Sequence, residues 1–120
     1  MKVLLEFVMS VNAALFFFGA LQHAGLAIGR FHEPRIVPAA IVEALCGFAL
    51  VWGVIALASR TRFARRTAVI SNLIALFGVL LGIASLALGA GPRTASNDLY
   101  HKIMLVMIGA ALLLIGFSGE

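Results

Sequence analysis

Residues 36–58 read IVPAAIVEALCGFALVWGVIALA, a run whose only charged side chain is Glu43. Each residue of a helix advances about 1.5 Å, so about 20 mostly apolar residues cross a hydrocarbon core of about 30 Å. The run is long enough for that crossing. Residues 36–58 are therefore predicted to form a transmembrane helix.

Three further stretches share this apolar character and cover residues 3–28, 68–90 and 101–117. The connections between them are short: residues 29–35 contain Pro34, residues 59–67 carry four arginines, and residues 91–100 open with Gly-Pro. Short connections make consecutive helices antiparallel. We expect an all-α fold, a four-transmembrane-helix up-down-up-down bundle, with residues 1–120 forming a single integral membrane domain.

The composition excludes an ordinary soluble domain. Hydrophobic residues make up 62% of the chain and charged residues 12%, with a mean hydropathy of +1.09. So few charges cannot cover a surface exposed to water, and we expect the lipid bilayer to surround the protein. The net charge of +4 resides in short loops with no basic binding module around it, so no nucleic-acid partner is expected. The single cysteine, Cys46, excludes an intrachain disulfide and a CxxC redox pair.

The distribution of basic residues predicts the orientation, because cytoplasmic loops are enriched in Lys and Arg. The densest cluster lies in residues 59–67 and consists of Arg60, Arg62, Arg65 and Arg66. This places the loop and both termini in the cytoplasm, most simply at a bacterial inner membrane. The opposite side is nearly as basic, so dual insertion stays open; its basic residues are Arg30, Arg35, Arg93 and Lys102.

Small residues predict how the helices pack, because membrane helices associate through close backbone approach. Residues 68–90 carry a stripe at alternating spacings of four and three: Ser71, Ala75, Gly78, Gly82, Ser85 and Gly89. On residues 3–28, Asn12, Phe16, Gly19 and His23 follow the same spacing and should point into the bundle. Gly25 and Gly29 form a second GxxxG near the end of that helix. We expect both features to serve packing within the chain more than self-association.

Glu43 is the informative polar residue, because a carboxylate in hydrocarbon costs at least ~2.5 kcal/mol. In the expected topology His23, Glu43 and His101 approach the same non-cytoplasmic end, with His101 opening the fourth helix. Helical rise places Glu43 and His23 each roughly 8 to 10 Å below that end. The matched depths leave two interpretations open: a structural hydrogen bond that fastens the first helix to the second, or a site that contacts a ligand or a proton.

Glu43, His23 and His101 are the candidate catalytic residues, since a carboxyl group and an imidazole can exchange protons. The candidate ligand-binding residues are His23, Glu43, His101, Asn12, Arg35 and Asp98. Asn97 and Asp98 are also interpreted as an N-cap for the fourth helix. No metal site is predicted, because no HxxxH, HxxE or CxxC pattern places two ligands on one face. Quinone and haem stay open as cofactors.

The segment GALQHAG at residues 19–25, with PAAIVEALCG at residues 38–47 and Gly53, resembles the DoxX-like family of small four-helix membrane proteins. The resemblance covers the first two helices. It implies a bundle related to subunits of quinone-linked redox enzymes, and more distantly to sterol-isomerase-like and sigma-2-receptor-like proteins that bind hydrophobic ligands beside buried acids. The residues that match its pattern are His23, Glu43, Gly19, Gly47 and Gly53.

The leading functional hypothesis is a membrane bundle that binds a lipid-like or quinone-like ligand at this polar end, or that serves as an accessory subunit of a larger membrane complex. One alternative is an enzyme that uses Glu43 and His23 in acid–base chemistry on a lipid-soluble substrate. Another is a homo-oligomeric, proton-coupled transporter or channel subunit. The sequence does not decide whether the protein is an enzyme.

Overall fold

The computed structural model describes residues 1–118, which contain four helices and no strand beyond an isolated bridge between Ile28 and Phe31. Each helix is long and apolar enough to cross a membrane. Their bounds are α1 Lys2–His23, α2 Val37–Ala58, α3 Ala64–Ala87 and α4 Ala95–Phe117.

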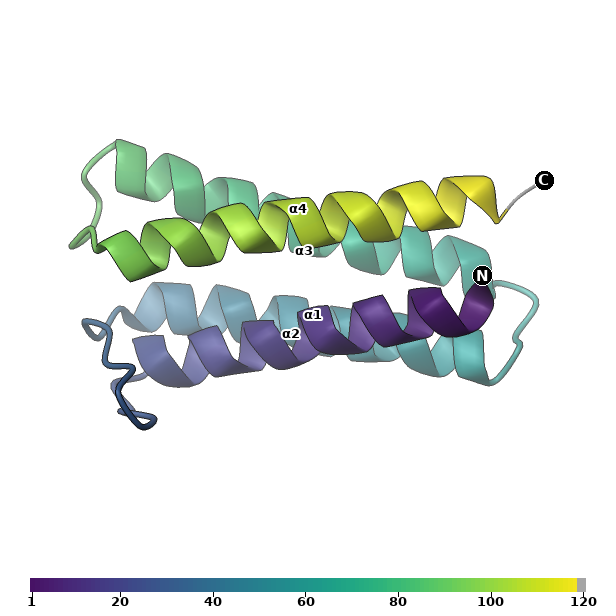
Figure 1. The fold of residues 1–120 in the computed structure, drawn as a ribbon, viewed down its shortest axis with the longest axis horizontal. Helices are drawn as coiled ribbons and strands as arrows, with labels where there is room; N and C mark the ends of the chain where they lie inside the picture. The colour runs from purple at the N-terminus through teal and green to yellow at the C-terminus, as the bar shows by residue number, and fades with distance from the viewer. Residues whose placement is uncertain (119–120) are drawn as a thin grey trace.

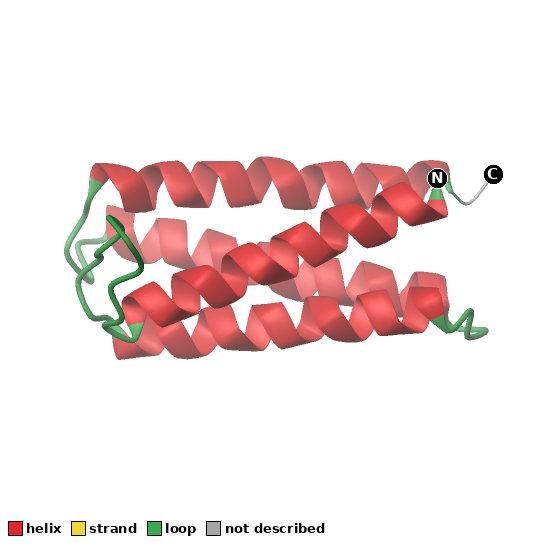
Figure 2. Cartoon of the chain, turned by 60° about the horizontal axis from the view of Figure 1, so that its bottom comes forward, coloured by secondary structure: helices red, strands yellow, loops and turns green. Residues whose placement is uncertain are grey.

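The helices lie side by side along a long axis of 43 Å (Figure 1). Both chain ends and the α2–α3 connection lie at one end of the molecule, and the other two connections lie at the opposite end (Figures 1 and 2). Each helix packs against two neighbours, in the cyclic order α1, α2, α3, α4. The contact between α1 and α4 is the least extensive of the four.

Helix α1 ends at His23, five residues before its predicted end, because Gly25 turns the chain with a φ of +99°. The Gly25 amide donates to the Gln22 carbonyl at 3.0 Å and the Leu26 amide to the Leu21 carbonyl at 3.1 Å. These two bonds complete a Schellman motif. Gly25 and Gly29 therefore lie in the connection, and the predicted helical GxxxG at this position is wrong.

Helix α4 begins at Ala95, six residues before the prediction, because Thr94 caps it. The Thr94 hydroxyl accepts a hydrogen bond from the Asn97 amide at 3.1 Å. The interpretation of Asn97 and Asp98 as the N-cap is wrong, since both lie in the first turn. His101 consequently lies nearly two turns inside α4 and does not open it.

Helix α3 begins at Ala64 inside the arginine cluster, four residues before its predicted start, so Arg65 and Arg66 are helical. It ends at Ala87, just before Gly89, whose φ is +72°. Helix α2 differs from the predicted range by one residue at its start.

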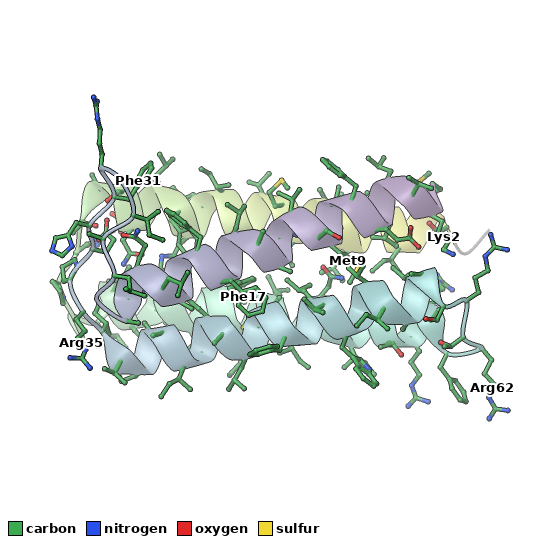
Figure 3. All side chains as sticks on the ribbon, turned by 90° about the horizontal axis from the view of Figure 1, so that it is seen from below. Lys2, Met9, Phe17, Phe31, Arg35 and Arg62 are labelled. Carbon is green, nitrogen blue, oxygen red and sulfur yellow. The ribbon has the colours of Figure 1, made fainter. Side chains whose placement is uncertain are left out.

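The core runs the length of the bundle and takes large apolar side chains from every helix, among them Met9, Phe16, Leu50, Val79, Met104 and Ile108. Polar side chains are also buried: Asn12 and Asn72 are fully enclosed. Along the length of the helices, the outward side chains are mostly apolar (Figure 3). Trp52, Phe77 and Val106 are each more than two-thirds exposed. The usual polarity of a soluble protein is therefore absent from the outer faces of these helices.

Small residues leave room for side chains from neighbouring helices. A Cβ at Gly53 of α2 would lie 2.6 Å from Met9 Cε and 2.8 Å from Ser71 Oγ. A Cβ at Gly78 of α3 would overlap Cys46 Sγ of α2. Gly78, which belongs to the stripe of small residues on α3, thus packs against α2 of the same chain.

Candidate ligand-binding site

A buried hydrogen bond joins the end of α1 to the second turn of α2. His23 Nδ1 and Glu43 Oε2 are 2.7 Å apart, and the two residues are 3% and 7% exposed. A polar pair so far from water needs each partner to satisfy the other. The structure brings together the two residues whose depths matched in the sequence.

The Tyr100 hydroxyl group of α4 and the Glu43 carboxyl group both lie against Gly19 of α1. A Cβ at Gly19 would lie 2.5 Å from the Tyr100 hydroxyl oxygen and 2.8 Å from Glu43 Oε1. Gly19 is thus needed for the close approach of both groups. The hydroxyl itself lies 3.3 Å from the Leu15 carbonyl, to which it donates.

Tyr100 is a site residue that the sequence reasoning missed. Because α4 was expected to begin at His101, Tyr100 was placed outside the helix. Once Ala95 is the start, Asn97, Tyr100 and Met104 fall on one inward stripe at spacings of three and four. The missed signal was the Thr94 cap.

His101 of α4 presents a hydrogen-bond acceptor to the bundle. Its Nδ1 lies 2.8 Å from the Asn97 carbonyl oxygen, which can only accept, so Nδ1 carries the hydrogen. In the neutral ring Nε2 is then the acceptor. That nitrogen lies against α3 at Gly82, where a Cβ would overlap it.

Two cavities meet at His23. The first, which we call the inner cavity, has a volume of about 290 Å³ and is lined by α2, α3 and α4 side chains including Val42, Glu43, Leu81, Leu86 and His101. The second, the seam cavity, has a volume of about 330 Å³ and lies between α1 and α4, lined by Phe18, Gln22, Leu99, Tyr100 and Ile103 among others. His23 and Asn97 line both. The polar pair therefore stands at the boundary of two mostly apolar spaces.

Several polar atoms at this boundary have no hydrogen-bond partner among residues 1–118. They are His23 Nε2 and both amide atoms of Gln22, a residue that is 3% exposed. Burying such atoms without a partner costs about 1–3 kcal/mol each. Gln22 is the second site residue that was not predicted, because a single glutamine near a helix end gives no sequence signal.

Glu33 covers the outer end of the seam cavity. Its carboxylate accepts a hydrogen bond from the Thr94 hydroxyl at 2.7 Å and another from the Ser96 hydroxyl. The α1–α2 connection is thereby tied to the start of α4. Glu33, which lies next to Pro34, thus joins two connections across the bundle.

The other predicted binding residues lie elsewhere. Asn12 is buried about 16 Å from His23 along α1, with neither side-chain amide atom hydrogen-bonded in the described part of the chain. Arg35 is exposed in the connection beside Gly25, and Asp98 pairs with Arg93 Nε at 2.9 Å. None of these three lines the inner or the seam cavity.

A haem bridging His23 and His101 does not fit these residues. His101 Nε2 is packed against α3 at Gly82, so an iron on that nitrogen would require α3 to move. Within residues 1–118, no group of three or more His, Cys, Asp or Glu side chains is arranged to hold a metal ion.

No family model, curated protein or solved structure matches this chain. The resemblance to the DoxX-like family stays a prediction.

Proposed function

We propose that this protein is a membrane-embedded bundle that binds a lipid-like or quinone-like ligand through the Glu43–His23 pair. The observation that carries the proposal is the placement of this pair, with His101, on an apolar cavity of about 290 Å³. Ligand pockets are typically apolar spaces of about 300–1,000 Å³ with a few convergent polar groups. The inner cavity is just below that range, a size that suits the head of a ligand.

The membrane placement is part of the same proposal. The chain would cross the bilayer four times in an up-down-up-down order, with both termini and the α2–α3 connection in the cytoplasm. Its support is the distribution of polarity: Phe77 and Val106 face outward while Asn12 and Asn72 are enclosed. Intramembrane polar side chains characteristically face the bundle interior.

The free hydrogen-bonding groups favour a particular ligand chemistry. Glu43 lines the inner cavity, and its carboxyl oxygens accept hydrogen bonds. A ligand that donates an O–H can satisfy Glu43, whereas a ketone offers it no hydrogen. The preferred ligands are therefore a long-chain alcohol, a sterol-like alcohol or a hydroquinone over its quinone.

The ligand would reach the site from the bilayer. The α1–α4 contact is the least extensive in the bundle, and the seam cavity lies between these helices next to His23. An apolar tail can lie in the seam while the head meets the polar pair. A role as the ligand-binding accessory subunit of a redox complex, as the DoxX-like resemblance implies, is one setting for this activity.

An enzyme is the second candidate, favoured by the 2.7 Å contact between the carboxyl and imidazole groups. Such a pair can move a proton to or from a bound substrate. Turnover of a lipid-soluble alcohol that is lost in Glu43→Gln while binding persists would select this candidate over a binding protein.

Native mass spectrometry of protein released from mild detergent tests the proposal. Wild type is expected to retain a specific lipid-sized mass, and Glu43→Gln is expected to lose it because an amide NH2 donor replaces one of the two carboxyl oxygens. Asp98→Asn is the matched control, since Asp98 lies toward the same end but outside both cavities. If Glu43→Gln and wild type retained the mass equally, Glu43 would not be part of a ligand site.

A further inference from the structure

A third cavity, of about 530 Å³, lies at the opposite end of the bundle, where the two chain ends and the α2–α3 connection meet. Its apolar lining comes from all four helices: Leu5, Leu57, Ala68 and Ile115. Three cationic residues line the same space, namely Lys2, Arg60 and Arg65. We call this the basic cavity. It contains none of the residues of the proposed ligand site.

The three cations come from three different elements, so the fold brings them together. Lys2 begins α1, Arg60 lies in the α2–α3 connection and Arg65 lies in the first turn of α3. Arg65 Nη2 donates to the Ile115 carbonyl of α4 at 3.4 Å, which leaves further N–H groups of the guanidinium free to donate. Lys2 Nζ also lies 3.5 Å from Oε1 of Glu6 on the same helix.

Arg60 occupies a backbone position that favours glycine. Its φ is +52°, and it alone among non-glycine residues 1–118 has a positive φ. The Thr61 amide reaches the Ala56 carbonyl at 3.4 Å and the Arg60 amide the Leu57 carbonyl at 3.2 Å, the bonds of a Schellman motif. Helices α1 and α3 end in the same way with glycine, at Gly25 and Gly89. An arginine that lines the basic cavity thus stands where the other two helix ends have glycine.

We propose that the basic cavity binds one anionic phospholipid. The headgroup phosphate would lie among Lys2, Arg60 and Arg65, because guanidinium and ammonium groups are strong phosphate donors. The first part of the acyl chains would lie on Leu5, Leu57 and Ile115. This inference rests on the membrane placement proposed above, which brings this end to the cytoplasmic headgroup layer.

Two arginines of the same connection region provide matched controls. Arg62 stacks on Phe63, with its guanidinium carbon 4.3 Å from the ring centroid, and does not line the basic cavity. Arg66 does not line it either. If the loop attracted anionic lipid only through its overall charge, replacing Arg60 or Arg62 would weaken lipid binding equally. A specific site in the basic cavity predicts that only the Arg60 replacement weakens it.

The test uses the full chain in vesicles of equimolar phosphatidylglycerol and phosphatidylcholine with identical acyl chains, followed by native mass spectrometry of the retained lipid. Wild type is expected to retain phosphatidylglycerol preferentially. Arg60→Gln should reduce that preference about fivefold, and Arg62→Gln should leave it unchanged. Excess inorganic phosphate, which lacks acyl chains, should not displace the lipid.

Arg60→Gly separates binding from folding. Glycine relieves the positive φ, so this variant should unfold at a higher temperature than wild type while losing the preference for phosphatidylglycerol as Arg60→Gln does. Equal losses in Arg60→Gln and Arg62→Gln, or no preference in wild type, would overturn the inference and leave the Glu43 site untouched. Failure of wild type to insert into the vesicles would overturn both proposals.

Discussion

At the scale of single residues, His23 and Glu43 each depend on the other. Their 2.7 Å contact is buried, and either group alone would face an apolar surrounding. The sequence predicted that both residues share a depth, because helical rise gives each the same distance from the helix end, and the structure shows the contact between them. It could not predict Tyr100 or Gln22, whose positions depend on where α4 begins and on how closely α1 and α4 approach.

This dependence predicts a strong coupling between the two side chains. His23→Ala leaves the Glu43 carboxyl group without its hydrogen-bond partner and should lower the free energy of unfolding by about 3 kcal/mol. Glu43→Gln keeps an acceptor for the imidazole and should cost about 1 kcal/mol. Reversible unfolding in mixed detergent, measured for both single variants and the double variant, gives the coupling energy. Strictly additive effects would show that the contact contributes nothing to stability.

At the scale of helices, glycine positions determine how closely neighbours pack. Gly53 admits Met9 and Ser71, while no heavy atom of a neighbouring group lies within 4 Å of the Cβ position at Gly109. The four apolar runs predicted the number and kind of elements. The helix ends were harder to predict, since they follow local bonds such as the Thr94 cap and the left-handed turn at Gly25.

Gly53→Ala and Gly109→Ala should therefore behave differently. The new methyl group at position 53 would press on Ser71 Oγ at 2.8 Å and should destabilise the bundle by roughly 1–3 kcal/mol. At position 109 the methyl group meets open space and should be neutral or stabilising by under ~1 kcal/mol. Thermal unfolding of the two variants in the same detergent checks this. A loss at position 109 equal to that at position 53 would contradict the packing account.

At the scale of the whole molecule, the structure places both termini and the α2–α3 connection at one end (Figure 1). The dense cluster of four arginines there predicts that this end is cytoplasmic. Cys46 is buried, so Cys46→Ser provides a background for single cysteines at Arg62 and His32. The presence of four helices was predictable from the four apolar runs, but the inner and seam cavities were not, because they depend on how side chains pack between helices.

In intact cells a membrane-impermeant thiol reagent should label the cysteine that replaces His32 and spare the one that replaces Arg62. After the membrane is opened, both should react. Labelling of both positions in intact cells would indicate dual insertion, and the reverse pattern would invert the proposed orientation.

Photoaffinity labelling can show whether the Glu43–His23 pair belongs to a ligand site. The probe is a long-chain alcohol with a diazirine near its hydroxyl group, and its methyl ether is the control. The alcohol should label inner-cavity residues such as Val42, Leu81 and Leu86. Glu43→Gln should abolish this labelling, and the ether should give little of it. Labelling confined to outward side chains such as Phe77 and Val106, unchanged in Glu43→Gln, would show that the pair only fastens α1 to α2.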